Sequence, residues 1–240
     1  MNIRIFQKGF NYSQDGPGNR LVYHLQGCGM RCPWCANPEG MAMTGGRTLA
    51  AEELLDEVRR SRSMFFDGGG VTFTGGEPTA QFEALRFLLE SIKAMEVDTA
   101  IETNGSHPRL GELLGLIDHL MIDFKQPFPG PHREITGVPL EIVLSNLRLA
   151  CASHPHVVVH IPMVNGYNAS PEAIEAFARI LAEMPKRNVG VEPLWYHEYG
   201  REKWEKQGLA YTVRDGFIPD ERKREILQTF RDYGLNVVRT

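Results

Sequence analysis

The chain alternates between two hydrophobic periods, and this alternation restricts its fold more than any other feature. Apolar runs rich in β-branched residues lie at 21–25, 71–74, 99–103, 120–124, 157–164 and 189–194. Between these runs, apolar residues recur with helical spacing. This order predicts an α/β fold in which helical crossovers join the strands of a parallel sheet. Periodicity alone leaves open whether the sheet is flat or curled into a barrel.

Five stretches have the apolar spacing of amphipathic helices, around 54–58, 82–92, 140–147, 174–181 and 226–230. Ser170 followed by Pro171 predicts the start of the fourth helix, since serine caps helices and proline is tolerated at the first helical position. We expect a last strand at 236–239. The aromatic and charged stretch 195–219 has no clear period, so we expect a long loop with one short helix there.

Polar residues follow four of the predicted strands directly. They are Gly75, Gly76 and Glu77 after the second strand, Glu102, Thr103 and Asn104 at the end of the third, Asp123 and Lys125 at the end of the fourth, and His197 after the sixth. In α/β sheets and barrels the functional site gathers at the carboxyl ends of the strands. The sequence therefore predicts one site at that edge.

Three of the four cysteines, Cys28, Cys32 and Cys35, lie within eight residues of one another in the loop after the first predicted strand. Three thiolates suit a four-iron cluster in which one iron keeps an open position. Structural zinc needs a fourth ligand, and His24 is poorly placed to supply it from the strand. An iron–sulfur site is thus favoured over zinc or merely buried thiols. Cys151 stands alone and is interpreted as a small buried hydrophobe.

Composition limits the partners and the location of the protein. Hydrophobic residues make up 42% of the 240 residues and charged residues 23%, as in ordinary globular domains. The net charge of −4 gives no electrostatic reason to expect nucleic acid or an anionic membrane as a partner. Neither a signal peptide nor an apolar run of membrane-spanning length is present. We expect one domain, 1–240, in a cytoplasmic protein that binds neither nucleic acid nor membrane.

The cysteine motif carries a family resemblance. Cys28-x3-Cys32-Pro33-Trp34-Cys35 resembles the signature of radical S-adenosylmethionine (SAM) enzymes. The preceding Asp15-Gly16-Pro17-Gly18-Asn19-Arg20 resembles the glycyl-radical-enzyme activating enzymes, of the pyruvate formate-lyase activating type. Further matches in the same order are Gly75-Gly76-Glu77-Pro78, Glu102-Thr103-Asn104-Gly105, Met121-Ile122-Asp123-Phe124-Lys125 and Tyr196-His197-Glu198-Tyr199-Gly200. The resemblance covers nearly the whole chain.

The resemblance implies a single radical SAM domain, 1–240, folded as a partial (β/α)6 barrel of the TIM type. It implies a [4Fe-4S] cluster on Cys28, Cys32 and Cys35. A reduced cluster would cleave SAM to methionine and a 5′-deoxyadenosyl radical, which takes hydrogen from a glycine of a partner, a glycyl radical enzyme. A flavodoxin or ferredoxin is the expected electron donor, and the activating enzyme is expected to be an anaerobic oxidoreductase and a monomer.

The resemblance also implies SAM contacts. They come from Trp34, Gly75, Gly76, Glu77, Asn104, Lys125 and His197. Glycines allow close backbone approach, and Glu77 is expected to accept from the SAM amine. An ordinary strand-to-helix turn is the alternative for Gly75–Glu77, while the spacing excludes a phosphate loop. His160 is a further candidate, but relatives commonly carry arginine there, and histidine is shorter and titrates near neutrality.

A monovalent cation, K+ or Na+, is expected at four positions of the family pattern, which are Glu102, Thr103, Met121 and Asp123 here. Relatives can carry an aspartate at the position of Glu102. The reach of the glutamate carboxylate differs from that of an aspartate. Asp123 and Lys125 lie two apart and face the same side of a strand. Paired charges inside a barrel are costly unless a ligand uses them, and a solvated strand end is the alternative.

Asp15 and Gly16 are expected near the glycyl loop of the partner, because the family places this segment there. A plain turn that leads into the first strand explains the same residues. Only 40–47 separates the cysteine motif from the first helix, without a further cysteine, so no ferredoxin-like module is inserted and we expect one cluster.

Three other functions compete with activation. A radical SAM enzyme for a small molecule or a peptide leaves the segment 15–20 unexplained. An anaerobic ribonucleotide reductase activase is usually shorter than this chain. An iron–sulfur electron carrier, which is not an enzyme, needs a fourth cysteine ligand and has no use for Gly75–Glu77.

Overall fold

The computed structural model describes residues 1–185 and 188–239. Within them, eight strands form one sheet in the order β3-β1-β2-β4-β5-β6-β7-β8. The strands are β1 (Asn2–Tyr12), β2 (Asn19–Leu25), β3 (Arg47–Ala50), β4 (Gly70–Gly75), β5 (Asp98–Thr103), β6 (His119–Asp123), β7 (Val157–Met163) and β8 (Val189–Trp195). All six predicted apolar runs are strands in the structure.

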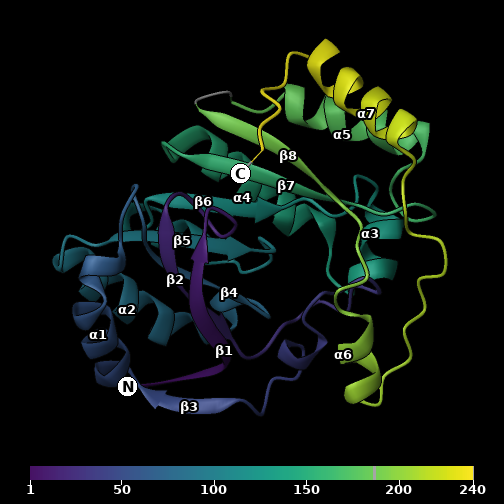
Figure 1. Ribbon diagram of the computed structural model, residues 1–240. Coiled ribbons are helices and arrows are strands. Elements are labelled where there is room, and N and C mark those ends of the chain that lie inside the picture. Colours follow the sequence, from purple (N-terminus) through teal and green to yellow (C-terminus); the bar gives the residue numbers. More distant parts are fainter. Residues whose placement is uncertain (186–187, 240) are drawn as a thin grey trace.

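The sheet is parallel from β2 to β8, and β1 pairs antiparallel with both β2 and β3. Figure 1 shows that the six parallel strands curl around a common interior. The predicted α/β class and the partial (β/α)6 barrel are therefore confirmed, with β1 and β3 added at one edge.

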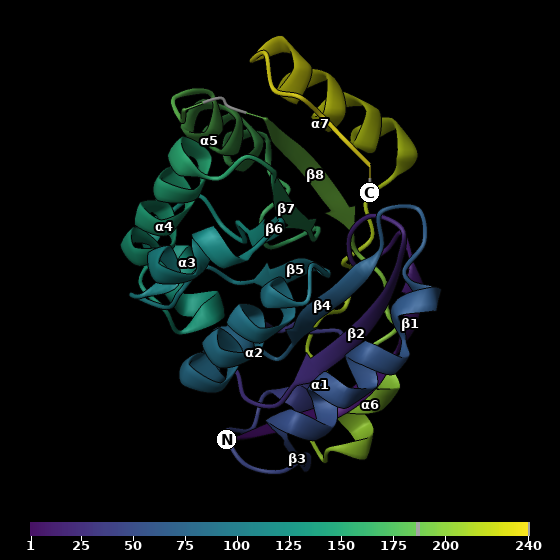
Figure 2. The ribbon, with the colours of Figure 1, turned by 90° about the vertical axis from the view of Figure 1, so that its left-hand side faces the viewer.

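Most helices lie on the outer side of the curled sheet (Figure 2). The helices are α1 (Ala51–Arg60), α2 (Phe82–Ala94), α3 (Pro129–Thr136), α4 (Leu140–Ser153), α5 (Pro171–Ala182), α6 (Arg201–Lys206), which packs on the loop after β2 instead, and α7 (Asp220–Asp232). Four short 3-10 helices complete the set: η1 (Pro38–Gly40), η2 (Arg62–Met64), η3 (Pro78–Gln81) and η4 (Leu110–Leu116). Ser170 caps α5 as predicted, because its side chain accepts a hydrogen bond from the Ala173 backbone N–H. The short helix expected within 195–219 is α6.

Several elements differ from the prediction or were not predicted. The residues 236–239 form no strand, and only Val237 makes a single bridge with Val191 of β8. No helix was predicted between β5 and β6, where the structure has the 3-10 helix η4. Two edge strands were not predicted either: β1, whose residues are mostly exposed apart from the buried Ile3 and Ile5, and the four-residue β3.

Alternate residues of each strand face the helices or the barrel interior. Tyr23 and Phe73 stack at a ring-centroid distance of 5.9 Å, and the Tyr23 hydroxyl donates to Glu57 of α1. Thr74, one residue after Phe73, faces the interior, where its hydroxyl donates to Glu102. The outer layer is thus the hydrophobic core, and the interior keeps the polar groups for a site.

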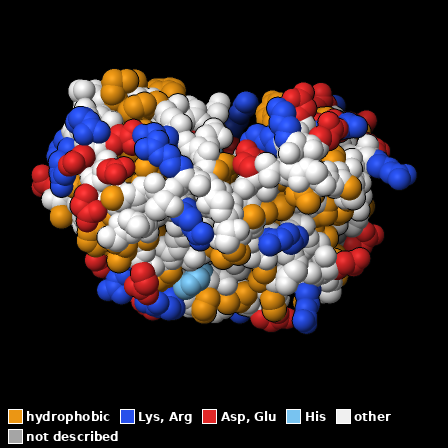
Figure 3. Space-filling view, turned by 90° about the horizontal axis from the view of Figure 1, so that it is seen from below, with side chains coloured by type: hydrophobic (Ala, Val, Ile, Leu, Met, Phe, Trp, Pro, Cys, Tyr) orange, Lys and Arg blue, Asp and Glu red, His pale blue; other side chains and the backbone are white. Residues whose placement is uncertain are grey.

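Two observations bear on interaction surfaces. Seen from below (Figure 3), acidic and basic side chains are mixed over the face of the molecule, and neither sign dominates. In the described part of the chain, no single helix is long and apolar enough to cross a membrane, and the bent pair α3–α4 meets the length and composition test only when its helices are taken together.

Candidate active site

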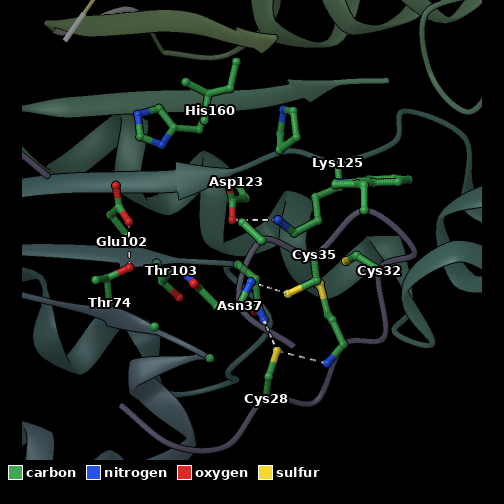
Figure 4. Close-up of a pocket in the computed structure, with 18 of the residues that line it drawn as sticks. Cys28, Cys32, Cys35, Asn37, Thr74, Glu102, Thr103, Asp123, Lys125 and His160 are labelled. Atoms are coloured by element: carbon green, nitrogen blue, oxygen red, sulfur yellow. Dashed lines mark hydrogen bonds and ion pairs between the residues drawn. The ribbon is translucent and has the colours of Figure 1, made fainter. Parts of the chain in front are cut away.

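One hollow lies at the carboxyl ends of the parallel strands, and it collects most of the predicted site residues (Figure 4). The predicted residues that line it are Cys28, Cys32, Trp34, Cys35, Gly75, Gly76, Glu102, Thr103, Asn104, Met121, Asp123, Lys125, His160 and His197. The cysteine loop follows β2, and the other residues come from strand ends far along the chain. The fold therefore brings polar groups from β4 to β8 opposite the three thiols.

The three thiols fit an iron–sulfur cluster that leaves one iron without a cysteine. The Cys28 sulfur accepts from the Met30 N–H at 3.4 Å, and the Cys35 sulfur accepts from the Asn37 N–H at 3.4 Å. Burial raises the pKa of each thiol to about 11. Loss of the proton from these three thiols therefore depends on the positive charge of bound iron. Among the described residues, no three His, Cys, Asp or Glu side chains gather around one point as the ligands of a single metal ion do.

Gly75 and Gly76 are required by backbone packing at the end of β4. Gly75 has a φ of +111°, and a Cβ on it would lie 2.5 Å from the Leu25 nitrogen. A Cβ on Gly76 would lie 2.4 Å from the Gly40 oxygen and 2.5 Å from the Gly27 oxygen. The glycines therefore let the strand end pack directly against both ends of the cysteine loop.

Glu77 is buried in the structure. It is 3% exposed and lies outside the lining of the hollow. Its carboxylate accepts from the backbone N–H and hydroxyl of Thr79, the hydroxyl of Thr103 and the backbone N–H of Asn104, at 2.5–3.0 Å. These four hydrogen bonds hold the end of β5 against η3, and the contact of Glu77 with the SAM amine stays a prediction.

Asn104 and Lys125 turn toward the thiols. The Asn104 amide nitrogen lies 3.7 Å from the Cys28 sulfur. The Lys125 ammonium lies 2.7 Å from an Asp123 carboxylate oxygen. Burial alone lowers the pKa of Lys125, but Asp123 and the nearby Cys32 and Cys28 thiols raise it overall. Lys125 is therefore a fixed positive charge in the wall of the hollow.

Glu102 and His160 lie deeper, below Asp123. Burial raises the pKa of Glu102, and the carboxylates of Asp15 and Asp123 add to this effect. The His160 Nε2 lies 3.5 Å from the Glu192 carboxylate on β8. Burial lowers the pKa of His160, but Glu192, Glu102 and Asp123 raise it overall. His160 thus interacts with three carboxylates. Glu192 was not predicted as a site residue, although a glutamate within a buried strand is itself a signal of a functional site.

Trp34 and His197 both line the hollow. Trp34 is 9% exposed and packs edge-to-face on Tyr167 at 5.2 Å. His197 is exposed and stacks on Tyr199 at 4.2 Å. Burial lowers the pKa of His197, so its ring is neutral at physiological pH. Both rings offer flat aromatic surface at the mouth of the hollow.

The segment 13–18 lies at the other end of the strands from the cysteines. It connects β1 to β2 and folds inward, so that the Asp15 carbonyl accepts from the Thr72 hydroxyl at 2.7 Å. Gly16, with a φ of +110°, packs near Ala100 on the inner side of β5. Asp15 and Gly16 therefore lie under the barrel interior and outside the lining of the cysteine hollow.

A second hollow adjoins this segment. It is lined by Gly16 and Pro17 of the turn, by Val158 and Gly190 of the last two strands, and by Met121, which also lines the cysteine hollow. Met121 of β6, which is buried, is thus common to the walls of both hollows.

Residues outside the predicted set complete the rim. The hollow is also lined by Met30, Asn37, Thr74, Pro162, Val164, Leu194, Trp195 and Tyr196. Trp195 comes from the stretch without a period, where only its aromatic character gave a signal, whereas Tyr196 begins the matched motif that ends at Gly200.

Comparison with known proteins assigns the family. The model of the radical SAM superfamily matches residues 22–181. The pyruvate formate-lyase-activating enzyme of Clostridium pasteurianum is 37% identical over 219 residues, which cover 90% of this chain and 91% of that protein. The pyruvate formate-lyase 1-activating enzyme of Escherichia coli K12 is 32% identical, over 93% of each chain.

A solved structure agrees with this assignment. A domain of the pyruvate-formate lyase-activating enzyme of Bacteroides vulgatus has a TM-score of 0.59 and 26% identity to this chain, with 71% of this chain and 98% of that chain covered. Both sequence relatives align over at least nine-tenths of this chain. The chain therefore belongs to the radical SAM superfamily and, within it, to the glycyl-radical-enzyme activating enzymes of the pyruvate formate-lyase activating type.

Proposed function

We propose that this radical SAM enzyme activates a glycyl radical enzyme by removing a hydrogen atom from a glycine of that partner protein. The observation that carries the proposal is the similarity to two pyruvate formate-lyase activating enzymes, which are 37% and 32% identical to this chain over 90% and 93% of its length. The hollow that gathers the three thiols with polar groups from the strand ends supports the same conclusion.

The enzyme uses a [4Fe-4S] cluster and SAM. When bound and reduced, the cluster supplies the electron that cleaves SAM to methionine and a 5′-deoxyadenosyl radical. In our proposal Cys28, Cys32 and Cys35 hold the cluster. The deep position of the thiols keeps solvent away from a radical formed beside them.

SAM is bound, in our proposal, by the groups that face the thiols across the hollow. Gly75 and Gly76 line the hollow beside the cysteine loop, and we propose that their backbone carbonyls contact the methionine end of SAM, since the Gly76 N–H already donates to the Leu25 carbonyl at 2.9 Å. Asn104 and the Lys125 ammonium offer donors for its carboxylate. Trp34 and His197 offer aromatic surface for its adenine, and His160 enters only through its carboxylate partners. These roles agree with the lining of the hollow.

A monovalent cation is proposed among Glu102, Thr103, Met121 and Asp123. Glu102 and Asp123 supply two carboxylates in one wall of the hollow. The Asp123 carboxylate already pairs with Lys125, so a cation there shares this ligand with the ammonium. K+ and Na+ suit oxygen ligands of this kind.

The partner's glycyl loop is proposed to contact Asp15 and the second hollow, which Gly16 lines. Asp15 is half-buried, and its carboxylate faces Asn11. A loop that leaves the core of its own protein binds at a cost, so the complex is expected to be transient. We further propose a flavodoxin or ferredoxin as the electron donor and a monomeric activating enzyme.

The test uses the reconstituted enzyme with the full-length partner enzyme under anaerobic conditions. Electron paramagnetic resonance should detect a glycyl radical on the partner, and 5′-deoxyadenosine should form in proportion to it. Asp15→Ala should cleave SAM as wild type does but transfer the radical roughly tenfold less, since a charge-assisted contact with the loop is lost. Gln14→Ala in the same turn is the control and should resemble wild type.

Two results would oppose the proposal. If 5′-deoxyadenosine forms with no radical on the partner, the substrate is not this glycine. If Asp15→Ala activates the partner as fast as Gln14→Ala does, the turn does not recognise the loop.

A further inference from the structure

The segment 196–217 after β8, here called the strap, packs against the cysteine loop. It contains the only part of the 195–219 stretch that forms a helix, α6, and Figure 1 shows α6 beside the loop that follows β2. The Trp204 indole N–H donates to the Cys35 carbonyl at 2.9 Å, across 169 positions in the sequence. Trp204 is 9% exposed, so this hydrogen bond is shielded from water.

The strap backbone is in direct contact with the peptide that follows Cys35. A Cβ on Gly200 would lie 2.5 Å from the Cys35 oxygen and 2.9 Å from the Ala36 Cα. Real Cβ atoms do not approach backbone so closely, and backbone cannot move aside as a flexible side chain can. The close packing and the indole hydrogen bond therefore act on the same peptide group.

Lys203 adds a second attachment. Its ammonium lies 2.7 Å from the Asn37 side-chain oxygen and 3.1 Å from the Glu39 carboxylate. The backbone N–H of Asn37 is the donor to the Cys35 sulfur. Lys203 thus fixes the residue that hydrogen-bonds the third thiol.

The strap is braced from behind by its own aromatic residues. Trp204 packs edge-to-face on Tyr211 at 5.7 Å. The hydroxyls of Tyr211 and Tyr196 lie 2.8 Å apart, and Tyr196 packs edge-to-face on Phe217. Trp204 therefore comes from a packed element and not from a free loop.

We propose that the strap is a positioning element for Cys35, in which Trp204 and Lys203 set how firmly the cluster is held and how easily it is reduced. Residues that fix metal ligands from outside are commonly as important as the ligands. The reduction potential of an iron–sulfur cluster depends on hydrogen bonds to its sulfurs. The inference rests on the cluster alone and is independent of which partner is activated.

Four variants test the assignment in the full-length protein with its cluster. Trp204→Phe keeps the ring and removes the donor, and Lys203→Met removes the ammonium. Tyr211→Phe and Lys206→Met are the matched controls, since Tyr211 does not contact the cysteine loop and Lys206 is exposed on the same helix as Lys203. The measurements are the rate of iron loss to a chelator and the midpoint potential of the cluster, both anaerobic and without SAM or partner.

Trp204→Phe should lose iron about fivefold faster than wild type, the factor that one hydrogen bond is worth. Lys203→Met should shift the midpoint potential to more negative values, because a positive charge and the anchor of an N–H···S bond are lost. Lys203→Arg should restore the potential. Both controls should match wild type.

The proposal is overturned if Trp204→Phe retains iron as wild type does and Lys203→Met leaves the potential unchanged. It is also overturned if Tyr211→Phe loses iron as fast as Trp204→Phe, since general loosening of the strap then explains the effect. Circular dichroism of each variant checks its fold, and should Trp204→Phe fail to fold, the Lys203→Met and Lys203→Arg pair decides alone. SAM cleavage and partner activation do not enter these measurements, so their failure is seen separately.

Discussion

Single residues at this site owe their positions to contacts that the sequence does not display. Gly75, Gly76 and the three cysteines were found from motifs, and the structure adds the reason for the glycines, which is close backbone packing of Gly75 against Leu25 and of Gly76 against Gly27 and Gly40. Glu77 was found from the same motif as the glycines, but its hydrogen bonds to the end of β5 were not predicted. A motif gives the residue type and the spacing, whereas the direction of a carboxylate depends on donors 26 and 27 positions away.

The first prediction concerns Glu77. Glu77→Gln should lower the free energy of unfolding of the cluster-free chain by about 2 kcal/mol, because buried donors of Thr79, Thr103 and Asn104 lose a charged acceptor. Urea unfolding curves measure the effect. Glu83→Gln, at an exposed glutamate on α2, should change it by less than about 0.5 kcal/mol. Unchanged stability together with a loss of SAM affinity would instead support the direct contact expected from the sequence.

At the scale of elements, the predictable parts are those whose hydrophobic pattern is local. The six parallel strands are buried on both faces and read as apolar runs. β1 was missed because its outer half is exposed, and β3 because it has four residues. The 236–239 segment has a strand-like composition but no room for more than one bridge beside β8. Whether a segment pairs at the edge of a sheet depends on the strands beside it. The hydrophobic pattern of that segment alone therefore indicates little about such pairing.

The turn between β1 and β2 is held by a buried guanidinium. Arg20 is 0% exposed and donates to the Thr72 hydroxyl, to backbone carbonyls including that of Pro17, and to the Asp98 carboxylate at 2.7 Å. Burial raises the pKa of Asp98, but His119 and Arg20 lower it overall. The motif that suggested partner binding thus also joins the turn to β4 and β5.

The second prediction follows from this contact. Asp98→Asn should lower the free energy of unfolding by about 2 kcal/mol at neutral pH, because a buried cation loses its counter-charge. Since the pKa of Asp98 is lower in the folded chain than in the unfolded chain, the contribution is present above pH 3.8 and disappears as the pH falls through the folded value. Urea unfolding at neutral pH and below pH 3.8 measures it.

Asp56→Asn is the control for this comparison, because Asp56 is 57% exposed and pairs with an exposed arginine. A difference between wild type and Asp98→Asn that stays constant across this pH range would show that the ion pair with Arg20 is not its cause.

For the whole molecule, the sequence predicted the class of fold and the end of the barrel that carries the site. It could not predict that the 13–18 turn folds under the interior, or that 196–217 packs on the cysteine loop, because both depend on how far the sheet curls. Curling is a property of all strands together. Arg20 and Trp204 join these distant parts of the chain. Their structural roles could therefore be assigned only from the fold.

The third prediction tests the cluster on which the whole arrangement depends. Anaerobic reconstitution of wild type should give one four-iron cluster, and Cys32→Ala should lose it, because two thiols do not hold it. Iron and sulfide analysis measures both. Cys151→Ala is the control, since this thiol is buried far along the chain on α4 and should leave the iron content unchanged. A wild type that binds one zinc and no iron would contradict the prediction.

The contact between Trp204 and Cys35 also orders events in time. A ribosome makes the cysteines 169 positions before the indole that braces them. The newly made loop therefore exists for a period with its third thiol unbraced, and iron delivered then meets an open loop. Iron delivered after synthesis ends meets a loop that is already clamped. The position of Trp204 in the chain therefore leaves an interval in which iron can reach the cysteines before the indole holds their loop.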